Sequence, residues 1–269
     1  MKREPVFSYQ GWYPDSREAA LIHLAQVMEK DASPKRALAA ISPHAGWAFS
    51  GGVAGKVYSR IEIPERVVVL CPMHRAVGHP ISIWDEGIWE TPLGPMEVDE
   101  DFCRALMKKD TRVQVDFEAH RVEHAIEIQL PFIQHRNPQA KIVPLRLGHL
   151  DYESCLSLAE SLAKTMEQVD GETLVVASSD MSHESSLDVL ERNDALAIEK
   201  MMEMDAAGLH QVVSENDISM CGVIPVTVAL ETARLRGAAS IEKVEYTNSA
   251  AISGRHDYIV GYFGAIVLP

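Results

Sequence analysis

The run Val67-Val68-Val69-Leu70-Cys71, closed by Pro72, is the stretch of sequence that decides the fold. Consecutive apolar residues that end at a proline are typical of a β-strand buried on both faces. The runs at residues 37–41 and 173–177 have the same character. Strands of this kind occur in parallel sheets whose two faces are covered by helices, so these runs predict an α/β protein.

Segments with helical periodicity alternate with the predicted strands. In residues 18–30 the apolar side chains fall on one face of a helix, and Ser16 is a candidate N-cap. Similar helical patterns cover residues 52–60, 99–109, 123–135, 153–169, 188–204 and 223–236. The alternation predicts a single α/β domain over residues 1–269, with a mainly parallel central sheet covered by helices on both faces.

Further strands are expected in the second half of the chain. Residues 241–246 and 258–268 are late apolar runs that complete the sheet. Residues 141–147 contain Pro144, which lacks the N–H group that a strand donates to its neighbour. This segment is therefore expected at an edge or a bulge of the sheet.

Composition excludes several classes of protein. The 269 residues are 46% hydrophobic and 24% charged, which is typical of a globular chain. The formal net charge of −14 repels phosphate backbones, so no nucleic-acid partner is expected. No apolar run reaches the ~18 residues of a membrane span, so no membrane partner is expected either. The four cysteines form no CxxC pair, and we expect a reduced, cytoplasmic protein without disulfides.

Polar residues suited to chemistry follow the three strongest predicted strands. His44 comes after the first strand, His74 after the second, and Asp180 and His183 after the third. In parallel sheets, ligands bind beyond the carboxyl ends of the strands. If these strands are neighbours, the four side chains converge on one pocket.

Cys221 adds a thiol to this set. It precedes the predicted helix at residues 223–236, and a helix N-terminus favours a thiolate, which binds metals or attacks substrates. The alternative is a buried core residue, which we expect for Cys71, Cys103 and Cys155. Two imidazoles and one thiolate would form a catalytic type of metal site with open positions, suited to Fe(II), Cu or Zn. Asp180 and His183 would then be the supporting carboxylate and the acid/base.

A competing motif is His120-Arg121-Val122-Glu123-His124, which matches the H-x-x-E-H signature of inverted zinc proteases. That mechanism requires both histidines on one face of a helix. Residues 116–119 give no firm helical pattern, so we expect the helix to begin near Glu123 and His120 to lie in the preceding loop. The pattern therefore disfavours a zinc protease.

Several short motifs occur in the order seen in the Memo family, which this chain resembles from about residue 11 to its end. The segments that carry the resemblance are Gly11-Trp12-Tyr13, Pro43-His44-Ala45-Gly46, Pro72-Met73-His74, Glu123-His124-Ala125-Ile126-Glu127, Leu130-Pro131, Ser178-Ser179-Asp180, His183 and Cys221-Gly222. The resemblance implies a fold similar to that of class III extradiol ring-cleaving dioxygenases, which bind Fe(II) through two histidines and a glutamate.

The resemblance also implies that His44, His74 and Cys221 are the metal-site residues, with Asp180 and His183 nearby. Cys221 stands where the dioxygenases have a carboxylate, so ring cleavage does not carry over. Microbial members of the family are associated with radical-SAM proteins, which suggests a radical-SAM pathway partner.

Three hypotheses about function follow. The first is an Fe or Cu metalloprotein that performs redox or dioxygenase-like chemistry with His183 as acid/base, oriented by Asp180. The second is a non-enzymatic module that uses the same pocket to bind a small molecule or a peptide. The third is a metal-free hydrolase with Cys221 as nucleophile and the His183–Asp180 pair as base and orienting group.

Overall fold

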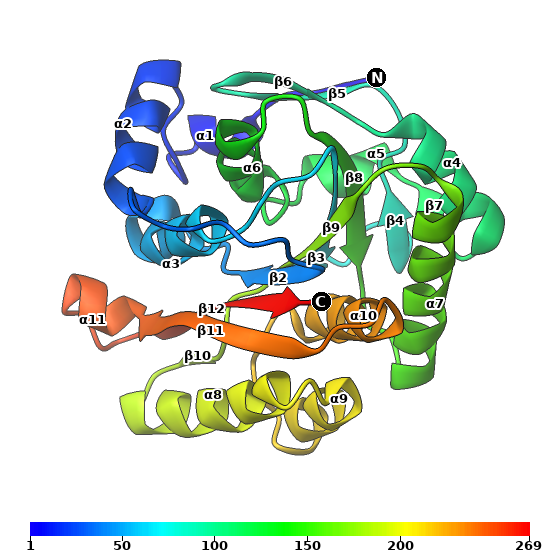
Figure 1. Ribbon diagram of the computed structural model, residues 1–269. Helices are drawn as coiled ribbons and strands as arrows, with labels where there is room; N and C mark the ends of the chain where they lie inside the picture. Colours follow the sequence, from blue (N-terminus) through cyan, green and yellow to red (C-terminus); the bar gives the residue numbers. More distant parts are fainter.

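Four parallel strands form the centre of the sheet in a computed structural model that describes all 269 residues. Their order is β2 (Ala39–Ser42), β9 (Thr173–Ser178), β3 (Arg66–Pro72) and β8 (Lys141–Leu147). Nearly every residue in them is buried, as expected of strands covered on both faces. The predicted α/β fold with a parallel central sheet is confirmed (Figure 1).

Antiparallel strands extend this centre at both ends. On the β2 side, β12 pairs antiparallel with β2 and also with β11 and β10. On the β8 side, β4 pairs antiparallel with β8 and is followed by β7. A separate small sheet has the order β1–β5–β6. The bounds of these strands are β1 Lys2–Arg3, β4 Ile81–Ile83, β5 Ile88–Thr91, β6 Gly94–Glu97, β7 Gln114–Val115, β10 His183–Glu184, β11 Ser240–Asn248 and β12 Ile259–Leu268.

The expectation that Pro144 marks an edge or a bulge was wrong, because β8 lies between β3 and β4. The carbonyl of Pro144 accepts a hydrogen bond from the N–H of Trp84, so its own nitrogen faces the same side. Strand β4 has already ended at Ile83 on that side. The missing N–H therefore removes no bond from the β4–β8 ladder.

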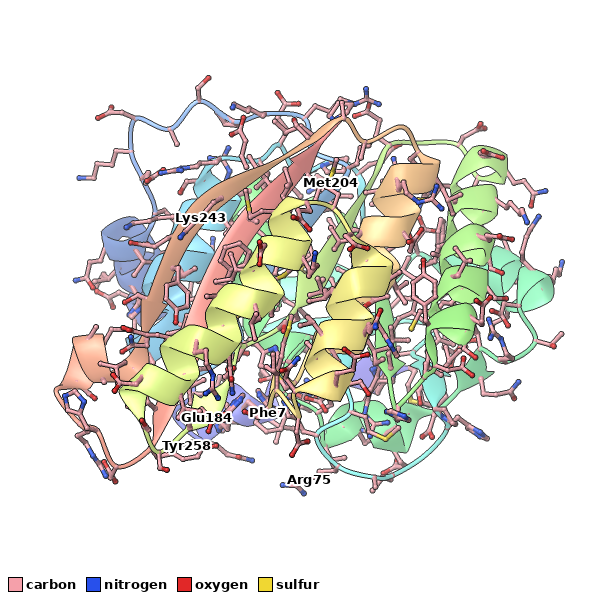
Figure 2. The ribbon with its side chains drawn as sticks, turned by 90° about the horizontal axis from the view of Figure 1, so that it is seen from below. Phe7, Arg75, Glu184, Met204, Lys243 and Tyr258 are labelled. Atoms are coloured by element: carbon pink, nitrogen blue, oxygen red, sulfur yellow. The ribbon has the colours of Figure 1, made fainter.

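Helices cover both faces of the sheet. Helices α2, α3 and α6 pack together on one face, and α7, α9 and α10 pack on the other (Figures 1 and 2). The bounds are α1 Val6–Tyr9, α2 Arg17–Val27, α3 Trp47–Ser59, α4 Glu100–Lys109, α5 Phe117–Arg121, α6 Leu130–Arg136, α7 Tyr152–Gln168, α8 Leu187–Met202, α9 Ala206–Glu215, α10 Val223–Leu235 and α11 Ser249–Ser253. None of them has both the length and the apolar character that crossing a membrane requires.

The helix expected to begin near Glu123 begins later, and His120 is helical rather than in a loop. Helix α5 contains His120, because the side chain of Asp116 caps it by accepting from the N–H of Ala119 at 2.9 Å. The chain then turns through Glu123 and His124 before α6. This turn lies beside the carboxyl ends of the central strands and becomes part of the site described below.

The apolar core is continuous across the central strands and both helical layers. Cys71, Cys103 and Cys155 are buried in it and unpaired, as predicted for core residues. Cys221 is also unpaired but is only partly buried.

Candidate metal centre

The carboxyl edge of the parallel sheet brings His44, His74 and Cys221 together. His44 follows β2, His74 follows β3, and Cys221 precedes α10. One ligand atom from each of the three lies within 4.8 Å of the others. The donor set, two nitrogens and one sulfur, fits a transition metal such as Fe, Cu or Zn.

His44 is held in one tautomer by hydrogen bonds beneath it. Its Nδ1 lies 3.0 Å from Oγ of Ser178, and that hydroxyl donates its own proton to the carbonyl of Ala125 at 2.7 Å. Ser178 therefore accepts from His44, which places the proton on Nδ1 and leaves Nε2 with a free lone pair. Nε2 is the atom that faces Cys221, at 3.3 Å from Sγ.

The Cys221 thiol is protonated in this arrangement, contrary to the expected thiolate. Burial and the nearby carboxylate of Asp180 raise the pKa of Cys221 well above its usual value. Burial and the neighbouring His74 lower the pKa of His44 well below its usual value. The desolvation cost of an anion outweighs the field of the helix N-terminus here, so a neutral S–H group faces a neutral imidazole.

His74 is anchored by Glu123, a residue that the sequence analysis did not assign to the metal site. The Nδ1 of His74 lies 2.7 Å from Oε1 of Glu123, and its backbone N–H donates to Oε2 at 3.0 Å. Burial raises the pKa of Glu123, but its bonds to His74 and the charges of His74 and His124 outweigh burial and lower it to about 2. Glu123 is therefore an ionised carboxylate beneath the site.

His124 is a third imidazole that the sequence reasoning did not assign to the site. Its ring centroid lies 4.5 Å from that of His74, 5.3 Å from that of His44 and 4.3 Å from Trp12. Burial lowers the pKa of His124 to about 3. The H-x-x-E-H motif contains His124 and could have drawn attention to it. The motif predicts a zinc-protease helix, however, and not a place in this imidazole cluster.

His120, the first histidine of that motif, lies elsewhere. It is fully buried, and its Nε2 donates to the carbonyl of Ser82 at 3.2 Å. It belongs to α5, which ends before His124, so the two histidines do not share a helical face. The geometry of an inverted zinc protease is absent.

Asp180 and His183 both line the pocket next to the metal-site residues, but they are not hydrogen-bonded to each other. The Oδ1 of Asp180 accepts from the backbone N–H groups of His44 at 2.7 Å and Ala45 at 3.2 Å. The ring Nδ1 of His183 lies 3.0 Å from the carbonyl of Ser219. Asp180 thus binds the main chain of His44. The carbonyl of Ser219, and not Asp180 as expected, orients the ring of His183.

A close approach of two chain segments places Cys221. A Cβ atom at Gly222 would lie 2.8 Å from Cα of Ser179 and would also overlap the Ser179 side chain. Only glycine allows the segment before α10 to contact the residues that follow β9 this closely. Gly222 therefore keeps Cys221 within reach of His44.

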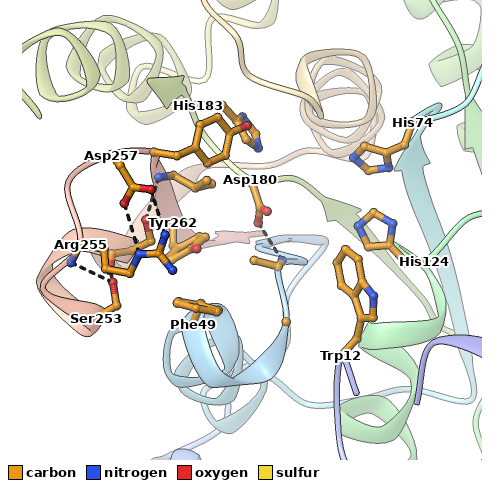
Figure 3. A pocket seen from close by; sticks show the side chains of 15 residues that line it. Trp12, Phe49, His74, His124, Asp180, His183, Ser253, Arg255, Asp257 and Tyr262 are labelled. Atoms are coloured by element: carbon orange, nitrogen blue, oxygen red, sulfur yellow. Dashed lines mark hydrogen bonds and ion pairs between the residues drawn. The ribbon is translucent and has the colours of Figure 1, made fainter. Parts of the chain in front are cut away.

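The pocket beside these residues has a volume of about 480 Å³, a size typical of small-molecule sites. His74, His124 and Trp12 lie on one side of it (Figure 3). Phe49, Tyr262 and Arg255 lie on the other, with Asp180 between the two sides (Figure 3). The pocket thus lies between aromatic side chains on one side and the imidazoles of His74 and His124 on the other.

The fold and the site define an α/β protein with a His/His/Cys cluster at the carboxyl edge of a parallel sheet. A family model described as Memo-like protein matches residues 7–266, and the chain belongs to the Memo family. The family resemblance seen in the sequence is thereby confirmed.

Relatives in this family match along most of their length. A MEMO1 family protein of Pyrobaculum aerophilum is 33% identical over 93% of this chain and 94% of its own. One from Aquifex aeolicus is 36% identical over 86% and 85%, and one from Archaeoglobus fulgidus is 34% identical over 95% of both chains. The crystal structure of an uncharacterized protein of Escherichia coli K12 covers 87% of this chain and all 100% of its own, with a TM-score of 0.55 and 12% identity. That likeness concerns the fold alone.

Proposed function

We propose that this protein binds one Fe or Cu ion through His44, His74 and Cys221 and carries out redox, dioxygenase-like chemistry on a small molecule. The observation that carries the proposal is the convergence of two imidazoles and a thiol within 4.8 Å at the edge of a pocket. An Fe or Cu ion held there would supply the redox chemistry.

The protein's own groups prepare this site for a metal. The Nδ1 atoms of His44 and His74 are both occupied by protein acceptors, so each imidazole has only Nε2 free. Neutral imidazole is the form that binds metals, and the burial of His44 favours it. Cys221 would lose its proton on binding, because the thiolate is the form that ligates.

His183 is our proposed proton carrier. Its Nδ1 faces the carbonyl of Ser219, which can only accept, so Nδ1 bears the proton and Nε2 can take up another. The residue lines the same pocket as His74 and Asp180. A small molecule between Trp12 and Phe49 would therefore be within the cavity that His183 serves.

Metal content tests this proposal directly. Elemental analysis would be done on protein purified anaerobically without a His-tag and then incubated with Fe(II) or Cu. We expect about one ion per chain in the wild type and in the control Cys155→Ser, which changes a buried thiol that is not among the grouped ligand residues. His44→Ala and Cys221→Ser should lose the ion. A wild type that takes up neither metal would overturn the proposal.

A thiol hydrolase is the second candidate, because Cys221 contacts an imidazole, although that imidazole is His44 rather than His183. The raised pKa of Cys221 opposes a ready nucleophile. If the hydrolase reading holds, metal-free protein should react rapidly with iodoacetamide at Cys221 near neutral pH. If the pocket is a binding module, ligand affinity should be the same in the wild type and in Cys221→Ser.

We further propose that the ligand of the pocket is a small molecule or a peptide. We also propose that the protein acts in a pathway with a radical-SAM protein. The cytoplasmic location expected from the sparse cysteines also stays a prediction.

A further inference from the structure

We propose that Glu123 is a positioning residue that holds His74 in the orientation and tautomer required of a metal ligand. This inference rests on the proposed metal function of His74. In this proposal, Glu123 fixes the exposed side chain of His74 so that it can act as a metal ligand.

His74 sits on a loop that provides little support of its own. Residues 74–80 are all exposed, and the His74 side chain retains 30% of its exposure. Arg75, the next residue, projects from the margin of the molecule (Figure 2). A histidine in such a loop would sample several rotamers unless another element fixed it.

Glu123 supplies that fixation from inside the protein. Its side chain is only 2% exposed, and it contacts His74 twice, at the ring Nδ1 and at the backbone N–H. Two contacts to one residue determine both the path of the loop and the rotation of the ring. The N–H of Ala125 donates to the same Oε1 at 3.1 Å and fixes the carboxylate in turn.

The same loop is held from the sheet by Arg146. This fully buried side chain of β8 donates from Nη1 to the carbonyl of Val77 at 2.8 Å and from Nη2 to the carbonyl of Arg75. Its Nε has no hydrogen-bond partner, but it lies 3.7 Å from Oε2 of Glu123. The guanidinium thus lies beside the carboxylate and holds the chain that follows His74 through the carbonyls of Arg75 and Val77.

An ionised carboxylate can only accept hydrogen bonds, so the Nδ1 of His74 must carry the proton. The lone pair is then on Nε2, the nitrogen left for a metal. A carboxylate partner on Nδ1 also fixes the direction in which Nε2 points. Oε1 of Glu123 lies 3.4 Å from Nδ1 of His124 as well, which places both imidazoles against one anion.

Glu127 offers a matched control four residues further along. It is also a fully buried carboxylate in an ion pair, but its partners are Arg3, Tyr13 and backbone N–H groups, and no imidazole. A purely structural role for Glu123 would make Glu123→Gln behave like Glu127→Gln. A positioning role separates the two variants.

The first measurement uses Fe(II) binding under anaerobic conditions, with the folded fraction of each protein checked by circular dichroism. We expect Glu123→Gln to bind Fe(II) about 10–100-fold more weakly than the wild type, because the ring loses its charged anchor. Glu127→Gln should bind within about twofold of the wild type. Equal affinity in the wild type and Glu123→Gln, or equal losses in both variants, would overturn the inference.

The second measurement needs no variant. Nitrogen-15 NMR of the metal-free wild type should show His74 as the Nδ1–H tautomer, and Glu123→Gln should show a mixture. A wild-type His74 protonated on Nε2 would overturn the inference even if Glu123→Gln fails to fold. The wild type could instead bind two ions, of which Glu123→Gln loses the second. That result would overturn the inference, because Glu123 would then be a metal ligand itself. A wild type that binds no metal but shows the expected tautomer would refute the proposed metal function alone.

Discussion

The buried ion pair between Arg3 and Glu127 is predicted to be among the most costly interactions to break. The side chain of Arg3 is 1% exposed to solvent, and that of Glu127 is 0% exposed. Glu127 also accepts from the N–H groups of Phe7 at 2.8 Å and Ser8 at 3.2 Å and from the hydroxyl of Tyr13 at 3.0 Å. The pair therefore ties the N-terminal segment to the 3-10 turn at Glu127–Gln129 that leads into α6.

Glu127→Gln removes the negative charge and keeps the shape of the side chain. Arg3 would then be a buried cation whose remaining acceptors are the carbonyls of Glu4, His120 and Glu123. Breaking a buried pair in this way costs about 3–5 kcal/mol, a large part of the ~5–15 kcal/mol that stabilises a typical protein. At roughly 2–4 °C per kcal/mol, the melting temperature should fall by about 6–20 °C.

Urea denaturation of the wild type and of Glu127→Gln measures this loss. The control is Lys164→Gln, which breaks an exposed pair with Glu160 at 3.1 Å on α7 and should cost no more than about 0.5 kcal/mol. In a double-mutant cycle, Arg3→Gln combined with Glu127→Gln should cost clearly less than the sum of the two single changes. A loss below about 1 kcal/mol in Glu127→Gln, or strict additivity, would refute the reasoning.

Two further predictions concern His120 and Gly222. Burial lowers the pKa of His120 to about 3, below the ~6.5 of the unfolded chain. The unfolded chain therefore takes up a proton that the folded protein cannot as the pH falls below ~6.5, and stability declines by about 2 kcal/mol at pH 5. His120→Asn should lose less stability than the wild type between pH 7.5 and pH 5.0 in urea titrations, and an equal loss would contradict the assignment. Gly222→Ala should cost about 1–3 kcal/mol and weaken Fe(II) binding, because the new methyl group overlaps Ser179 and displaces Cys221. Unchanged metal affinity in folded Gly222→Ala would show that Cys221 does not depend on this close contact.

The sequence by itself determined the central architecture. The apolar run that became β3 and its counterparts in β2 and β9 were recognisable because a strand buried on both faces is apolar at consecutive positions. The order of elements placed His44, His74 and Asp180 beyond the carboxyl ends of adjacent strands, so their proximity could be predicted. The short strands and α9 lacked so strong a local pattern and were missed.

Only the tertiary structure decided the chemistry of the site. The pairing of Glu123 with His74 joins residues 49 positions apart, and the contact of Cys221 with His44 joins residues 177 apart. The protonated thiol, the tautomers and the orienting partner of His183 depend on burial and on neighbours contributed by other elements. The hydrophobic pattern of a strand or helix can be read from a few consecutive residues. Desolvation and hydrogen-bond partners exist only after distant segments of the chain have packed together.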